Sequence, residues 1–146
     1  MTFALDLQKF AAKAGARADA VVAGVTAEII AKVDLRSPVG DPTKWKNKPP
    51  AGYVGGRFRG NWQLGIGTIP AGVLNKVDPS GRGTVTANIA EIPRDAAGRV
   101  YFLVNNLPYS RRLEEGHSTQ APAGIVGLTV IEFQGIVDRA VARAAA

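Results

Sequence analysis

The sequence predicts an α+β fold: a small twisted β-sheet flanked by a long N-terminal helix and a C-terminal helix, with an extended Pro/Gly-rich loop. Apolar residues recur every three or four positions near both ends of the chain, which indicates amphipathic helices. Two central segments have the composition and spacing of strands. Prolines and glycines crowd the stretch between the first helix and the first strand.

The first helix is expected over residues 3–33. Its apolar stripe consists of Phe10, Ala14, Ala18, Val21, Val22, Val25, Ile29 and Val33. Charged residues such as Lys13 and Arg17 fall largely off this stripe, where water can solvate them. Pro38 ends the segment, because proline lacks the N–H donor and disfavours helix in the residue before it.

Residues 38–56, called the arm below, contain four prolines and four glycines, which prevent regular structure. A loop this long without elements of its own is usually functional or disordered. Cations and aromatic residues are interleaved in the arm and just after it. These candidate partner contacts are Lys44, Trp45, Lys46, Lys48, Tyr53, Arg57 and Arg59. We expect the arm to become ordered only against a neighbouring subunit.

Three interpretations of this basic group remain open. It is a solvated loop anchored by Trp45, a contact with an acidic neighbouring subunit, or a direct contact with DNA. The last is chemically reasonable because cations neutralise phosphates and aromatic rings stack on exposed bases.

Two strands are predicted in the middle of the chain. The first covers residues 57–69, with Phe58, Trp62, Leu64 and Ile66 on one face. The clearest strand covers residues 99–105, where four consecutive apolar residues predict burial on both faces or between subunits. Residues 70–83 form a turn-rich connection, and residues 84–92 suit either a strand or a helix.

Two helices are predicted in the last third. A short one covers residues 107–115, with Pro108 in its first turn and Gly116 at its end. A longer one covers residues 124–144 and should pack beside the first helix. Its expected stripe consists of Val126, Val130, Phe133, Val137, Ala140, Val141 and Ala144.

Composition limits the possible functions. A chain of 146 residues fits a single domain, 1–146. It has no cysteine and one histidine, which excludes disulfides, thiolate zinc sites and any site with two imidazoles. We therefore expect no metal and no cofactor. Charges interrupt the apolar N-terminal residues, so we expect no signal-peptide core, no membrane contact, and synthesis in the cytoplasm. The net charge of +6 suggests a polyanionic neighbour.

The most enzyme-like cluster is EEGHS at residues 114–118. A carboxylate near a histidine and a serine can support acid–base or nucleophilic chemistry. No glycine-rich elbow surrounds Ser118, and no second metal ligand lies at helical spacing from His117. The cluster is interpreted as a helix end followed by a polar loop, and no catalytic residue is assigned.

Several segments together form a distinctive pattern: YFLVNNLPYS at 101–110, LEEGHS at 113–118 and QAPAGIVGLTV at 120–130. They resemble the "Asn-Asn-x-Pro-Tyr, Leu/Ile-Glu-x-Gly-His/Thr-Ser, Gln-Ala-Pro-x-Gly" pattern of tail-completion or neck (head–tail joining) proteins of long-tailed bacteriophages. RSPV at 36–39 and GRFRGNW at 56–62 are similar to that family's "Pro-Val…Gly-x-x-Arg-x-x-Trp" stretch. The motif residues are Asn105, Asn106, Pro108, Tyr109, Glu114, Gly116, His117 and Pro122.

The chain departs from the pattern in two places. Residues 41–55 separate the Pro-Val element from the Gly-x-x-Arg element, and Ser110 stands where alanine is common. The resemblance implies a structural virion subunit made in the host bacterium, with no catalytic residues. It implies a homo-oligomeric ring, six copies by analogy with tail symmetry, in contact with head-connector and tail proteins. Such a ring surrounds the DNA channel and contacts DNA at most non-specifically. The alternative is a small basic nucleic-acid-binding module, and an enzyme is a distant third.

Overall fold

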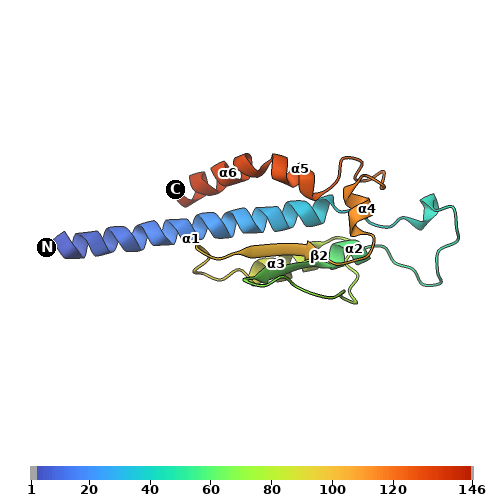
Figure 1. Ribbon diagram of the computed structural model, residues 1–146, viewed down its shortest axis with the longest axis horizontal. Helices are drawn as coiled ribbons and strands as arrows, with labels where there is room; N and C mark the ends of the chain where they lie inside the picture. The colour runs from blue at the N-terminus through green and yellow to red at the C-terminus, as the bar shows by residue number, and fades with distance from the viewer. Residues whose placement is uncertain (1–2, 146) are drawn as a thin grey trace.

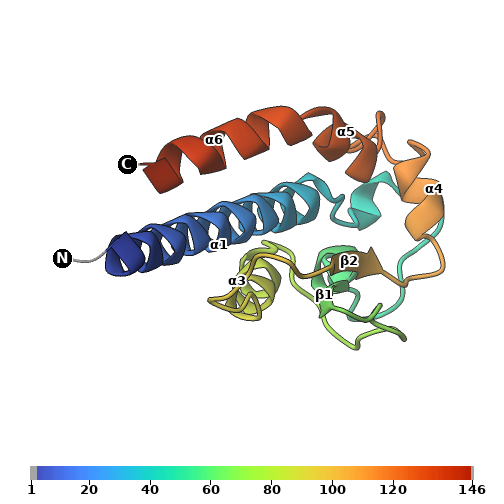
Figure 2. The ribbon, with the colours of Figure 1, turned by 60° about the vertical axis from the view of Figure 1, so that its left-hand side comes forward.

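The computed structural model describes residues 3–145, with side chains from Leu7 onward, and has the expected α+β architecture. The first helix forms a central layer, with the last two helices on one side of it and the sheet and third helix on the other (Figures 1 and 2). The elements are α1 (Phe3–Arg36), α2 (Arg57–Gly60), β1 (Trp62–Ile66), α3 (Arg82–Ala90), β2 (Tyr101–Asn105), α4 (Ser110–Glu114), α5 (Val126–Ile131) and α6 (Phe133–Ala145).

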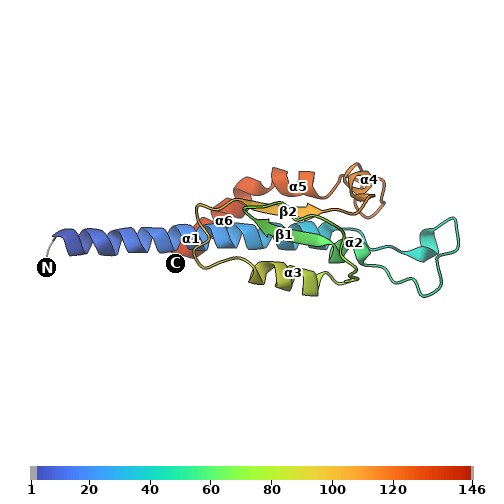
Figure 3. The same cartoon turned by 60° about the horizontal axis from the view of Figure 1, so that its bottom comes forward.

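The long N-terminal helix is confirmed and continues to Arg36, so α1 spans about 50 Å. Its C-terminal part enters the core, where Ile30 and Val33 are buried. The side chains of residues 7–18 are all exposed, and Phe10 is 70% exposed. The N-terminal half of α1 therefore projects beyond the body, at the opposite end of the molecule from the arm (Figure 3).

The strand predicted over residues 57–69 is wrong in its first part. Residues 57–60 form the helical turn α2, and β1 begins only at Trp62. Gly56, with φ of 110°, reverses the chain, and the Asn61 amide donates to the Arg57 carbonyl oxygen at 2.8 Å, which closes the turn. Phe58 and Trp62 are four residues apart, so they fit a helical turn as well as the even spacing that predicted a strand.

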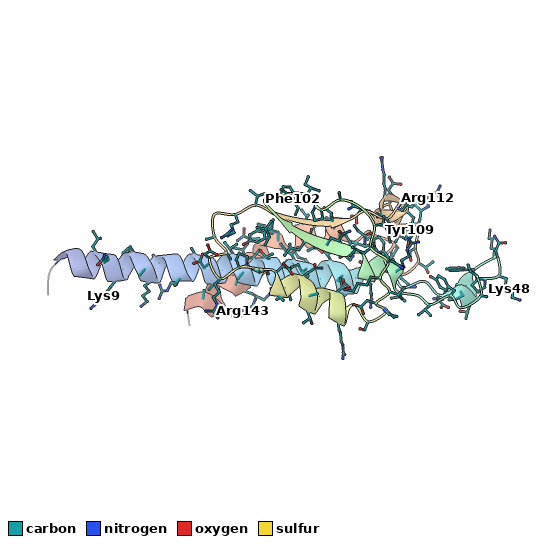
Figure 4. The ribbon with its side chains drawn as sticks, turned by 90° about the horizontal axis from the view of Figure 1, so that it is seen from below. Lys9, Lys48, Phe102, Tyr109, Arg112 and Arg143 are labelled. Atoms are coloured by element: carbon teal, nitrogen blue, oxygen red, sulfur yellow. The ribbon has the colours of Figure 1, made fainter. Side chains whose placement is uncertain are left out.

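The predicted sheet is confirmed as an antiparallel pair of β1 and β2, with Trp62 opposite Asn105 and Ile66 opposite Tyr101. All five residues of β2 are half-buried, so the expected burial on both faces is not reached within this chain. The Phe102 side chain points away from the body in Figure 4.

The single helix predicted over residues 124–144 is interrupted at Glu132, where α5 ends before α6 begins. The Glu132 carboxylate lies 3.0 Å from Lys32 Nζ and 2.6 Å from Arg36 Nη2, so α1 holds the break in place. The predicted stripe is also wrong in part. The residues of this region that are buried are Ile125, Thr129, Ile136 and Ala140. The exposed members of the stripe are Val126, Val130, Phe133 and Val141.

The ambiguous segment 84–92 is helical, as α3. The short helix expected over residues 107–115 is confirmed in a shorter form, α4, and Pro108 precedes it. The arm contains one 3₁₀ turn, Pro42–Lys44, and is otherwise irregular, as expected from its composition.

The main core lies where the end of α1 meets α2, β1 and the segment joining α4 to α5. Its buried members are Val33, Phe58, Trp62, Leu107, Ala121 and Ile125. The Phe58 and Trp62 rings meet edge to face with centroids 5.6 Å apart. Beside it, α6 packs along α1 as predicted, with Ile136 and Ala140 buried, and Glu28 of α1 pairs with Arg139 and Arg143.

Candidate functional site: the motif residues and the arm

The two motifs after the first helix meet in the structure. Trp62 Nε1 donates to Ser37 Oγ at 2.8 Å, and Ser37 Oγ donates to the Val33 carbonyl oxygen at 2.8 Å. The Ser37 hydroxyl thereby caps the end of α1, whose last carbonyl groups have no partner within the helix, and the Trp62 indole holds that hydroxyl in place. The Pro-Val element and the Gly-x-x-Arg-x-x-Trp element thus form one joint.

Arg59 belongs to this joint rather than to the basic surface of the arm. Its Nε donates to the Ser37 carbonyl oxygen, Nη2 to that of Leu35 and Nη1 to that of Pro79, each at 2.9 Å. The planar guanidinium can make three such bonds from fixed directions. Arg59 was predicted to be a partner contact. In the structure, its guanidinium N–H groups instead donate hydrogen bonds to carbonyl oxygens of the same chain.

Asn105 and Asn106 fix the corner after β2. The Asn105 amide donates to the Phe58 carbonyl oxygen at 2.8 Å, and the Asn105 side-chain oxygen accepts the Leu107 N–H at 3.3 Å. The Asn106 amide donates to two carbonyl oxygens of the 70–83 connection, at 3.0 Å each. Ser110 Oγ donates to the Leu107 carbonyl oxygen at 2.6 Å, a bond that an alanine at this position would lack.

Glu114 joins α4 to α5. Its carboxylate accepts the backbone N–H groups of Ile125, Val126 and Gly127 at 3.0, 2.9 and 2.9 Å. Burial alone would raise the pKa of Glu114, but these three hydrogen bonds outweigh it and lower the pKa. Gly116, with φ of 87°, lies against Pro122, where a Cβ atom would collide with the Pro122 carbonyl oxygen.

In the EEGHS cluster, the side chains that form hydrogen bonds form them with other parts of the chain rather than with one another. Glu114 is occupied by α5, and Glu115 pairs with Arg111 at 3.0 Å. His117 is exposed, and Ser118 Oγ accepts the Gln120 N–H at 3.2 Å. In the described part of the chain, no hydrogen bond joins the His117 side chain to Glu114 or Ser118.

The arm presents most of the predicted partner contacts. Lys46 and Lys48 are exposed, and Lys48 lies at the far end of the arm in Figure 4. Lys44 lies 3.9 Å from Asp41, whose carboxylate also accepts two hydrogen bonds from Thr43. Those hydrogen bonds lower the pKa of Asp41.

The base of the arm is closed and attached to the body. A Cβ atom at Gly55 would collide with the Gly40 carbonyl oxygen, so the two limbs of the arm touch through their backbones there. Gln120 fixes the first limb, because its side chain accepts the Val39 N–H at 3.0 Å and donates to the Val39 carbonyl oxygen at 2.7 Å.

A pocket of about 600 Å³ lies between the arm and the body. Trp45 and Tyr53 of the arm line one part, with ring centroids 4.7 Å apart. Phe58 and Tyr109 of the body line another, with centroids 6.1 Å apart. The structure therefore brings the motif residues Tyr109 and His117 next to Lys44, Trp45 and Tyr53 of the arm and Arg57 of α2.

Sequence reasoning assigned no contact to three polar residues, although Gln120 is one position of the Gln-Ala-Pro-x-Gly pattern. Gln120 anchors the arm, and Asp78 accepts hydrogen bonds from Ser80, Gly81 and Thr84 in the turn before α3. The Asp78-Pro-Ser-Gly sequence is a turn signature that could have identified the second. Asp34 is fully buried on α1, and nothing in the helical pattern distinguished it.

No protein-family model matches the chain, and no curated protein or solved structure is significantly similar to it. None of the helices within residues 3–145 is both long and apolar enough to cross a membrane. Over the same residues, no three His, Cys, Asp or Glu side chains cluster closely enough to hold a metal ion.

Proposed function

We propose that the chain is a structural virion subunit of a phage neck or tail end. It forms a ring that joins or completes the tail at the capsid and surrounds the DNA channel. The observation that carries this proposal is the pair of projecting segments, the N-terminal half of α1 and the arm, which extend from opposite ends of the body (Figure 3). Both expose large apolar side chains, with Phe10 at 70% and Trp45 at 43%.

Neighbouring subunits would bury the exposed apolar side chains of the two projecting segments. A helix of about 15 residues is only marginally stable alone in water, and burying one large apolar side chain contributes about 1.5–3 kcal/mol. A ring gives every copy two neighbours, so each projecting segment can be buried once per subunit. Six copies agree with the symmetry expected of a tail.

The motif residues support the same proposal. Hydrogen bonds within the chain are made by Glu114, Asn105 and Trp62. The bond of Trp62 to Ser37 fixes the end of α1 at the point where the arm begins. A subunit that displays two contact segments on a fixed body is suited to closed assembly.

The exposed lysines of the arm favour a protein neighbour over a tight grip on DNA. A channel must let the duplex slide, and strong phosphate binding by every copy would oppose that movement. The lysines therefore contact an acidic surface of a head-connector or tail protein, with few of them facing the channel. Such contacts weaken as salt rises, because charges are screened over about 8–10 Å near physiological ionic strength.

Native mass spectrometry of the purified chain, alone and with tail tubes, tests the proposal. A closed ring, alone or on the tube end, is the expected result, and cryo-electron microscopy of the particle would then locate it at the neck. The proposal is contradicted if the chain stays monomeric, does not bind tails and binds DNA in a salt-sensitive manner. That result favours the alternative, a basic nucleic-acid-binding module.

A further inference from the structure

The pocket between the arm and the body has the size of a binding site. Its volume of about 600 Å³ lies within the roughly 300–1,000 Å³ typical of ligand pockets. One wall comes from the arm, and the other comes from α2, from Tyr109 and Leu113, and from the loop at residues 117–120. The arm wall is held in place by the Gln120 bonds to Val39 and by the contact of Gly55 with Gly40.

The walls are aromatic but not shaped for stacked bases. The Trp45 and Tyr53 ring planes are inclined at 57°, and those of Phe58 and Tyr109 at 37°. Base stacking needs a free ring face parallel to the base. Here the tilted pairs enclose an angular space, and Phe58 is only 5% exposed. Branched aliphatic side chains of a peptide fit such a space better than a flat base does.

Four side chains of the lining offer an occupant a hydrogen-bond donor or a positive charge: Lys44, Trp45, Arg57 and Tyr109. Within residues 3–145, no hydrogen bond to another protein group is made by the Arg57 guanidinium, the Trp45 indole N–H or the Tyr109 hydroxyl. Lys44 and Arg57 carry positive charge, and Asp41, the acidic residue of the lining, is already bonded to Thr43. An occupant must therefore supply acceptors, and charged acceptors form the strongest hydrogen bonds with these groups.

Tyr109 and Arg57 line the same pocket. Burial raises the pKa of the Tyr109 hydroxyl, the positive charge of Arg57 opposes that shift, and Tyr53 adds to it. The hydroxyl stays a neutral donor at physiological pH, with a cation beside it. A carboxylate entering the pocket would meet Tyr109 and Arg57 together.

We propose that this pocket binds an extended acidic segment of a partner protein, with one or two apolar side chains seated between Trp45 and Tyr109 and carboxylates at Lys44 and Arg57. The inference rests on the proposed joining role, because it identifies what the arm binds. It also gives the motif residue Tyr109 a contact function in addition to its packing against Phe58.

Fluorescence anisotropy with defined probes tests this inference on the full chain. The probe is a labelled Glu-Asp-Leu-Phe-Glu-Asp peptide, and the comparison probes are Lys-Lys-Leu-Phe-Lys-Lys and a ten-nucleotide oligothymidylate. We expect the acidic peptide to bind most tightly. The K44A/R57A variant should weaken its binding at least about tenfold, because two charge-assisted contacts are lost. W45A should also weaken it.

The matched control is K46A/K48A, which removes the same charge from the same arm outside the pocket lining. It should change binding less than about twofold, because exposed charges at a distance are screened. All substituted side chains are exposed, so unchanged melting temperatures will show that the variants fold.

Three results would overturn the inference: no binding of the acidic peptide, equal losses in the two double variants, or tighter binding of the oligonucleotide. Ring formation by native mass spectrometry is read separately. If the chain forms rings but does not bind the peptide, only this inference is contradicted. If it forms no ring and does not bind tails, the proposed function is contradicted.

Discussion

Asp34 is a buried carboxyl group without a partner. Its side chain is fully buried, and neither oxygen has a hydrogen-bond partner within residues 3–145. Burial and the nearby Asp78 carboxylate raise the pKa of Asp34 to about 7, against the opposing attraction of Arg59 and Lys76. A charged group held in this way lowers the stability of the fold at alkaline pH.

We predict that Asp34→Asn stabilises the protein at pH 8 more than at pH 4.5. The unfolded chain loses this proton near pH 4 and the folded chain near pH 7, so the contribution of Asp34 to stability falls as pH rises between these values. One pKa unit corresponds to about 1.4 kcal/mol. The gain from Asp34→Asn should therefore grow by at least about 1 kcal/mol between the two pH values, as measured by urea denaturation.

Asp95→Asn is the control for this experiment. Asp95 is exposed and bonded to Arg99 at 2.6 Å, which lowers the pKa of Asp95, so it is ionised in both states at pH 4.5 and above. Its substitution should have nearly the same effect at both pH values. A pH-independent effect of Asp34→Asn would contradict the ionisation argument.

At the scale of elements, the connection between α4 and α5 depends on one carboxylate. α5 has six residues and no side-chain cap of its own, so Glu114 satisfies the first N–H groups of the helix from outside it. The negative charge also interacts favourably with the N-terminal end of the helix.

Glu114→Ala should therefore lower the free energy of unfolding by about 2 kcal/mol near neutral pH, since hydrogen bonds to charged groups contribute about 1.5–3 kcal/mol. The pKa of Glu114 is lowered in the fold, so this contribution is present above the pKa of the unfolded chain and is lost as pH falls through the lower folded value. Denaturant titrations at pH 7 and pH 3 measure both effects. Glu115→Ala, which removes only an exposed pair with Arg111, should cost much less, and equal losses would contradict the capping role.

Elements that are determined by local sequence patterns could be predicted, whereas those that depend on contacts between distant residues could not. α1 carries a long apolar periodicity and β2 a run of four apolar residues, so the existence and type of both elements were predictable. The break at Glu132 was not, because it depends on Lys32 and Arg36, about a hundred residues earlier in the chain. α2 was misread because Phe58 and Trp62 satisfy strand and helix spacing equally.

The candidate site was predictable only as a set of residue types. The cations and aromatic residues of the arm were recognisable, but the role of Arg59 depends on the ends of α1 and of the 70–83 connection. The pocket lined by Trp45 and Tyr109 depends on how the arm leaves the body beside α4, and no local pattern encodes that placement.

The whole molecule is elongated, with the body between two projecting segments (Figures 1 and 3). Phe10 lies on the N-terminal half of α1, far from the core, so its substitution can separate folding from assembly. We predict that Phe10→Asp changes the free energy of unfolding of the monomer by less than about 0.5 kcal/mol, as is usual for surface substitutions.

In the proposed ring, the same substitution should raise the concentration needed for assembly at least about tenfold, because burying a phenylalanine between subunits would contribute about 1.5–3 kcal/mol. Native mass spectrometry over a dilution series measures this. Thr86→Asp, on the exposed side of α3, is the control and should leave assembly unchanged. Assembly of Phe10→Asp at the concentrations of the unchanged chain would show that this half of α1 is not a subunit contact.

Because the base of the arm is closed, the length of the arm can change without changing the fold of the body. Gly40 and Gly55 bring the two limbs together at the body, so the residues between them begin and end at nearly the same point. Insertions or deletions in that loop would alter its reach and its sequence without moving α1, α2 or the core. Related chains could therefore adapt to different partners by exchanging this one segment, and the same position offers a place to insert a label without disturbing the joints beneath it.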